Sequence, residues 1–304
     1  MLREAVAIDD QCALAWEAIA ISKVNWTMSG FAQAGAAARR ALELNDSLPE
    51  AWTVLAEIAE EEMRWTDSEE YFLRALYADP TNARANELYG ETLLARGRVK
   101  DGLRYTLEAY RYEPIWDFHV SLAAMMAANG ELTLKHARLM AKKYGSSSFY
   151  AVNGLAEGHL ILGETEQALE QYHLLDEENA PWFLECVSAR KDPGQWPDLA
   201  KRMQKTFKQH LSGEFDENQV ADAAWQMIRC GSWIGEADLV FDIMSAPEVT
   251  TEQRFIPLFY SDATALRQHP RFYKLVEETG LLAYWQKWGW SDYCEPDGDS
   301  FRCD

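Results

Sequence analysis

The 304 residues suffice for two ordinary domains or one extended array, and with 48% hydrophobic and 26% charged residues the chain is not of the disordered class. The excess of 49 Asp and Glu over 29 Lys and Arg gives a formal net charge of −20, which repels phosphate backbones and anionic lipids. We therefore expect neither nucleic acid nor a membrane surface as a partner.

The amino terminus contains no apolar run of the length that a signal peptide needs, and no stretch of about 18 uncharged apolar residues occurs elsewhere. We expect no membrane segment in this chain and a cytoplasmic location. Residues 2–10 resemble residues 71–80, the end of a helix in the repeat at residues 49–82, so the chain is expected to begin inside a repeat. Either a longer parent has been cut or a lone helix caps the array. A periplasmic location is the alternative if that parent is membrane-anchored.

An internal repeat with an offset of 34 residues occupies residues 49–114. Two antiparallel helices can cross closely only where small residues meet, so we expect Ala56 to face Ser68 and Gly90 to face Gly102. The proline that closes each copy ends the second helix. The positions that match at this offset are Ala56 with Gly90, Ser68 with Gly102, Ala75 with Ala109, and Pro80 with Pro114.

This spacing resembles the tetratricopeptide repeat family, whose pattern is W-x2-L-G-x2-Y, then A-x3-F, then P. The resemblance implies an all-α, right-handed superhelix of stacked hairpins. It also implies that the first helix of each hairpin lines a concave surface, which contacts an extended or helical peptide. Weaker copies lie at residues 13–46, 118–145 and 218–244, and a clearer one includes residues 155–175.

We divide the chain into three regions: a repeat array over 1–181, irregular hairpins over 182–253, and an aromatic-rich helical cap with a tail over 254–304. Terminal repeats must end the core without leaving an open apolar face, which suits an atypical cap. Its L-R-x-x-P-R-F motif (residues 266–272) and G-L-x-x-Y-W motif (residues 280–285) precede Cys294. This order resembles the closing segment of repeat regions in bacterial winged-helix transcriptional regulators and adenylate cyclases, which implies a regulatory or signalling context.

The five cysteines divide into two groups. Cys12, Cys186 and Cys230 lie in helical patterns, and we interpret them as buried free thiols. Cys294 and Cys303 lie close together in the tail. They can form a local disulfide in an oxidising compartment and remain two thiols in a reducing one.

The sequence contains no motif that indicates catalysis. It lacks a glycine-rich phosphate loop, and its six histidines have no HxxxH or HExxH spacing. Cys294 and Cys303 supply only two of the four ligands that a structural zinc ion needs. We therefore expect no enzyme activity, no cofactor and no metal.

The helical period places a set of charged side chains on the inner surface, about 100° from the core residues Trp52 and Leu55. This predicted partner-binding groove is acidic, and Arg84 is the only cation assigned to it, so a basic protein or peptide is one expected partner. A merely solubilising acidic surface is the alternative. The predicted groove residues are Glu57, Glu60, Arg84, Glu87, Glu91, Asn153 and Glu157, with Glu50 beside them.

Two functions fit these observations. The first is a non-catalytic protein–protein interaction scaffold, the repeat module of a bacterial regulatory or signalling protein. The second is a small-molecule sensor or an enzyme with a pocket in the irregular region at residues 182–211 or against the aromatic cap. An open, charged groove favours the first, and a convergent polar pocket favours the second.

Overall fold

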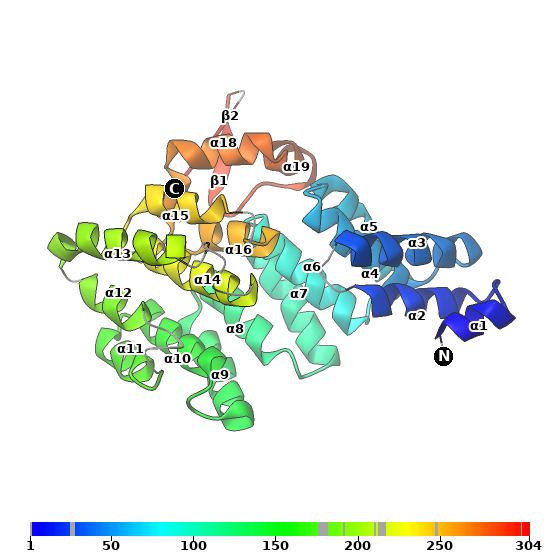
Figure 1. The fold of residues 1–304 in the computed structure, drawn as a ribbon, viewed down its shortest axis with the longest axis horizontal. Coiled ribbons are helices and arrows are strands. Elements are labelled where there is room, and N and C mark those ends of the chain that lie inside the picture. The colour runs from blue at the N-terminus through cyan, green and yellow to red at the C-terminus, as the bar shows by residue number, and fades with distance from the viewer. Residues whose placement is uncertain are drawn as a thin grey trace.

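The computed structural model shows a chain built almost entirely from α-helices (Figure 1). The expected all-α solenoid of stacked hairpins is confirmed. The structure describes residues 2–24, 28–175, 182–190, 192–209, 211, 217–246, 249–298 and 300–304.

The amino-terminal half consists of antiparallel hairpins, in which α2 pairs with α3, α4 with α5, α6 with α7, α8 with α9, and α10 with α11. The first helices of neighbouring hairpins also stack on one another, and α1 packs against α2. The bounds are α1 (Leu2–Ile8), α2 (Ala13–Lys23), α3 (Met28–Leu44), α4 (Pro49–Glu61), α5 (Trp65–Ala78), α6 (Ala83–Ala95), α7 (Val99–Tyr112), α8 (Asp117–Met126), α9 (Gly130–Tyr144), α10 (Phe149–Ile161) and α11 (Thr165–Tyr172).

The carboxyl-terminal half has shorter helices and ends in a β-hairpin. Its bounds are α12 (Phe183–Ala189), the 3-10 helix η1 (Pro193–Gln195), α13 (Trp196–Gln209), α14 (Glu217–Trp233), α15 (Ala237–Met244), α16 (Thr251–Phe255), the 3-10 helix η3 (Ile256–Phe259), α17 (Thr264–Arg267), α18 (Pro270–Glu278), α19 (Leu281–Trp288), β1 (Cys294–Asp297) and β2 (Ser300–Cys303).

The hairpins cross at the small residues that the repeat offset indicates. A Cβ atom on Gly90 would lie 3.0 Å from the carbonyl oxygen of Gly102, and one on Gly102 would lie 2.9 Å from the carbonyl oxygen of Gly90. In the preceding hairpin, Ala56 and Ser68 are both fully buried. Because the two helix backbones approach closely here, only small side chains fit at these positions, as the sequence predicts.

The tryptophan position of the repeat has a structural role. The indole N–H of Trp52 donates to the carbonyl oxygen of Asp46 at 2.8 Å, and that of Trp16 donates to the carbonyl oxygen of Asp10 at 2.9 Å. In the third hairpin Asn86 takes this place and donates from Nδ2 to a carbonyl oxygen six residues earlier, at 3.1 Å. Each of these side chains thus hydrogen-bonds its helix to the loop that precedes it.

The carboxyl-terminal half turns back and lies against the middle of the array (Figure 1), where α19 contacts α5 and η3 contacts α6. The indole N–H of Trp65 donates to the carbonyl oxygen of Thr279 at 2.6 Å, and that of Trp285 donates to the carbonyl oxygen of Arg96 at 2.8 Å. The aromatic-rich segment is therefore present as expected. It packs against the second and third hairpins as well as closing the last one.

One hydrophobic core joins the two halves, because Trp65, Leu94 and Met126 belong to the same cluster as Phe255 and Trp285. The expected boundary between residues 181 and 182 lies beside residues 176–181, which are outside the described part of the chain. The division into regions 1–181, 182–253 and 254–304 stays a prediction.

The tail forms a two-stranded antiparallel hairpin, which the all-α expectation did not include. Cys294 lies opposite Cys303 across the two strands, and their sulfur atoms are 2.07 Å apart. Cys186 and Cys230 are buried, as expected, but their Cα atoms lie only 5.6 Å apart, the separation of a disulfide-bonded pair. The interpretation of these two as isolated thiols is therefore wrong, because α12 and α14 bring together residues 44 positions apart.

Candidate functional site

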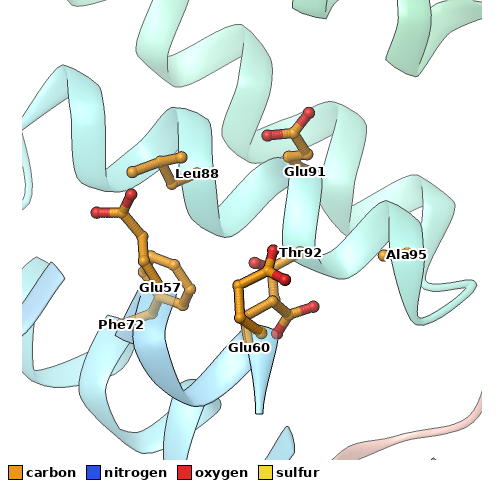
Figure 2. Close-up of a pocket in the computed structure, with 8 residues that line it drawn as sticks. Glu57, Glu60, Phe72, Leu88, Glu91, Thr92 and Ala95 are labelled. Carbon is orange, nitrogen blue, oxygen red and sulfur yellow. The ribbon is translucent and has the colours of Figure 1, made fainter. Parts of the chain in front are cut away.

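A pocket opens between the first helices of the second and third hairpins, α4 and α6 (Figure 2). It is a small opening with a cavity volume of about 40 Å³ that is continuous with solvent. Four of its lining side chains are carboxylates, and the others form an apolar floor with one threonine. The lining residues are Glu57, Glu60, Glu61 and Glu91, with Phe72, Leu88, Thr92 and Ala95.

The sequence of α4 explains why its glutamates face this pocket. Pro49 begins the helix, and Val54, Leu55 and Ile58 are buried in the core on one side. The 3.6-residue period then directs Glu57 and Glu60 toward α6. Figure 2 shows these side chains of α4 and Glu91 of α6 around one opening.

Arg84 reaches back from α6 to two glutamates of α4. Its Nη1 lies 2.8 Å from Oε2 of Glu50, and its Nη2 forms an ion pair with Oε1 of Glu57. Glu57 is only 5% exposed, and burial raises the pKa of its carboxyl group although Arg84 acts in the opposite direction. The carboxylate of Glu57 is thus held in place before a partner arrives.

Glu60 belongs to a buried hydrogen-bond network behind the pocket. Its Oε2 accepts hydrogen bonds from Arg96 and, at 3.2 Å, from Ser68. Arg96 is fully buried and also donates to Oε2 of Glu69 at 2.9 Å. Burial raises the pKa of Glu60, and its other oxygen, Oε1, is buried without a hydrogen-bond partner in the described structure.

Glu87, Glu91 and His119 converge beside this pocket. Glu87 and Glu91 lie one turn apart on α6, and His119 comes from α8, the first helix of the next hairpin. Nε2 of His119 is 3.1 Å from Oε1 of Glu87, and one ligand atom from each of the three residues lies within 4.8 Å of the others. Burial lowers the pKa of His119 to about 4, so the imidazole is neutral at pH 7.

Two predicted groove residues are buried, Glu157 by the returning half of the chain and Asn153 within its own hairpin. Glu157 is 2% exposed, and its carboxylate accepts two hydrogen bonds from Arg229 of α14, at 2.8 and 2.9 Å. Asn153 is buried on the same helix and accepts a hydrogen bond from Tyr172 at 3.2 Å. Their assignment to an open groove is wrong, because α14 lies over Glu157 and Asn153 packs within its own hairpin.

The expectation that Arg84 is the only cation at the inner surface is also wrong. Arg96 follows the end of α6 and pairs with Glu60, whereas Arg229 lies 72 residues after Glu157 and pairs with it. Repeat spacing alone could not show these pairings, because Arg96 lies beyond the end of its first helix and Arg229 pairs with a residue of a distant hairpin. The chain itself therefore compensates part of the acidic charge.

In the region proposed for a small-molecule pocket, hydrophobic side chains such as Trp182 and Phe183 are buried in the main core. An open groove lies elsewhere in that half, between α15 and α18, and includes Arg254, Arg271 and Lys274. Arg271 is already bound to an aspartate of α15, at 2.7 Å. No convergent set of groups favours a reaction there among the described residues.

No protein-family model matches this chain, and no curated protein matches it. It is similar to the solved structure of PilF of Pseudomonas aeruginosa, with 16% identity and a TM-score of 0.47, over 77% of this chain and 90% of that chain. It is also similar to PilW, a widely conserved type IV pilus biogenesis factor, with 16% identity and a TM-score of 0.48, over 79% of this chain and 97% of that one. YrrB, a TPR protein with an unusual peptide-binding site, has 17% identity and a TM-score of 0.47, over 57% and 90%.

The assignment of an all-α solenoid rests on the hairpins of this chain itself. In the described residues no helix is both long and apolar enough to span a bilayer.

Proposed function

We propose that this chain is a non-catalytic protein–protein interaction scaffold, and that the pocket between α4 and α6 receives a lysine or arginine side chain of a basic peptide segment. The observation that carries this proposal is the composition of the pocket. Four carboxylates surround the opening, the floor is apolar, and neither lysine nor arginine is among the described residues that line it.

A long cationic side chain matches both parts of this lining. Lysine and arginine have an apolar stem and a charged end, so the stem can lie over Leu88 while the charged end meets the carboxylates. Glu57 and Glu60 are held by Arg84 and Arg96, so little side-chain entropy is lost when a ligand binds them.

The returning half of the chain limits where the partner can lie. Because α14 covers Glu157 on α10, a partner cannot follow the inner surface as far as this part of α10. We expect a short segment along α4 and α6 rather than a peptide that follows the whole array.

We place this scaffold in a bacterial regulatory or signalling protein on the resemblance of its closing segment alone. The residues of that resemblance have structural roles. Arg267 is 1% exposed and donates to the carbonyl oxygens of Leu258 and Tyr260, at 2.9 and 2.7 Å, while Phe272 and Trp285 are fully buried. Such a motif is suited to anchoring the closing segment to the array.

Fluorescence anisotropy with labelled lysine-rich peptides tests the proposal. We expect the wild-type chain to bind these peptides and to bind their acetyl-lysine versions at least tenfold more weakly, because acetylation removes the charge. Binding should weaken between low salt and about 0.15 M, where the Debye length falls to about 8 Å.

The charge reversal Glu61→Lys should reduce peptide affinity at least tenfold, because it places a cation in the pocket lining. Glu113→Lys makes the same charge change in an exposed loop and is the matched control. Equal losses in the two variants, or equal binding of lysine and acetyl-lysine peptides, would show that only net charge matters and that this pocket is not the binding site.

A further inference from the structure

The stacking of first helices brings an imidazole over two carboxylates at the inner surface. Glu87 and Glu91 are four residues apart on α6, so they lie on the same helical face. His119 of α8 faces them, with Nε2 3.1 Å from Oε1 of Glu87. One ligand atom of each side chain lies within 4.8 Å of the other two.

We propose that Glu87, Glu91 and His119 bind a divalent first-row transition-metal ion, with Zn²⁺ as the probe ion, and that water completes its coordination. One imidazole nitrogen and two carboxylate oxygens form a donor set that such ions accept. A site with three protein ligands leaves one coordination position for water, whereas a structural zinc site has four protein ligands. This inference does not depend on the proposed peptide binding.

The backbone already has the spacing that this site needs. Metal–ligand bonds of about 2.0–2.2 Å place tetrahedral ligand atoms about 3.4 Å apart. The three atoms lie within 4.8 Å of one another, so they must approach by about 1 Å. Glu91 is only partly buried, and rotation of its side chain can supply this movement without displacing either helix.

The surroundings of His119 direct its ring toward the carboxylates. The rings of Trp116 and Phe118 lie against it edge to face, with centroids 5.5 and 5.1 Å away. Nδ1 of His119 is buried without a hydrogen-bond partner in the described structure, so no second hydrogen bond there turns the ring away from the glutamates. Nε2 is the ring nitrogen that lies beside the cluster, 3.1 Å from Oε1 of Glu87.

Isothermal titration calorimetry of the full chain with Zn²⁺ alone tests this site. Every protein should carry Cys12→Ser, because Cys12 is a free thiol and thiols bind zinc. We expect one equivalent to bind, and His119→Ala to weaken that binding at least tenfold. Glu91→Gln should weaken it as well, and its effect keeps the test valid if His119→Ala folds poorly.

The control is His159→Ala, because His159 also pairs with a glutamate, Nδ1 to Oε2 of Glu164 at 2.6 Å, but belongs to no three-ligand cluster in the described residues. It should leave Zn²⁺ affinity unchanged. Zn²⁺ should also raise the melting temperature of the parent and of His159→Ala, but not that of His119→Ala. Absence of binding below millimolar Zn²⁺, or equal weakening by the two histidine variants, would overturn the proposal.

Discussion

Arg229 joins the two halves of the chain through a buried ion pair. It is 4% exposed, and it binds Glu157 of α10 and Asp262, which follows η3, at 2.8 and 2.7 Å. Its guanidinium group also lies 3.9 Å from the ring centre of Tyr260. A buried carboxylate that loses its arginine partner keeps its desolvation penalty. Removing one member of such a pair therefore costs far more stability than replacing both members with hydrophobic residues.

We predict that Arg229→Met lowers the free energy of unfolding by about 3–5 kcal/mol, because Glu157 stays buried without its cation. Arg229→Met combined with Glu157→Met should recover much of this loss. Arg202→Met breaks a half-exposed pair with Glu185 and should change stability by less than about 1 kcal/mol. Urea denaturation measures all three, and similar losses for Arg229→Met and Arg202→Met would contradict the assigned role of Arg229.

At the residue scale, the sequence indicates which glutamates lie near one another, but it does not indicate which arginines pair with them. Glu57 and Glu91 line one pocket, and the helical period, a local property of α4 and α6, indicates that they face the same way; their role in binding a partner stays a prediction. Arg96 and Arg229 are missed, since their partners lie on other elements. His119 is missed as well, because the offset of 34 aligns it with Ala85, a fully buried position rather than an inner-surface one.

At the element scale, the hairpin crossings determine which substitutions the array tolerates. In the third hairpin, a Cβ atom on Gly90 would lie 2.6 Å from Oγ1 of Thr106 and 3.0 Å from its backbone nitrogen. Backbone atoms cannot move aside without displacing the whole helix. Larger side chains at a crossing therefore separate the two helices of a hairpin.

We predict that Ala56→Leu and Gly90→Leu each destabilise the array by about 1–3 kcal/mol or more, because overpacking at a crossing forces the backbone to shift. Ala32→Leu adds the same side chain at an exposed position of α3 and should have little effect. Chemical denaturation midpoints give the comparison. A wild-type midpoint for both crossing variants would mean that the helices do not meet at these residues.

At the scale of the whole molecule, the chain closes on itself rather than forming an open superhelix (Figure 1). The 34-residue offset predicts the hairpins, because each one depends on contacts within a single repeat or with the next. The return of the closing segment depends on pairs such as Trp65 with Thr279, which are 214 residues apart. No periodic pattern connects such residues, so the sequence indicates an aromatic cap without showing where it lies.

Gly97 is the point where this return meets the turn between α6 and α7. Its carbonyl oxygen accepts from the backbone N–H of Asp292 at 2.8 Å, and a Cβ atom on it would collide with the side chain of Ser291 and lie 2.6 Å from the ring of Phe259. Gly97 and Gly163 occupy corresponding turns with φ of +75° and +78°, but a Cβ atom on Gly163 would meet nothing within 4 Å. The two glycines therefore share the backbone requirement and differ only in the contact with the closing segment.

We predict that Gly97→Ala loosens the closing segment, so that hydrogen exchange in residues 279–304 speeds up by at least tenfold while exchange in α2 and α3 stays unchanged. Gly163→Ala also places a non-glycine residue in the left-handed conformation, at the same cost of about 1 kcal/mol. It should leave the hydrogen exchange of residues 279–304 unchanged. If both variants accelerate exchange there equally, backbone strain alone accounts for the effect, and Gly97 does not hold the closing segment against the array. If neither does, the many other contacts of this segment, such as that of Trp285 with the Arg96 carbonyl, suffice without Gly97.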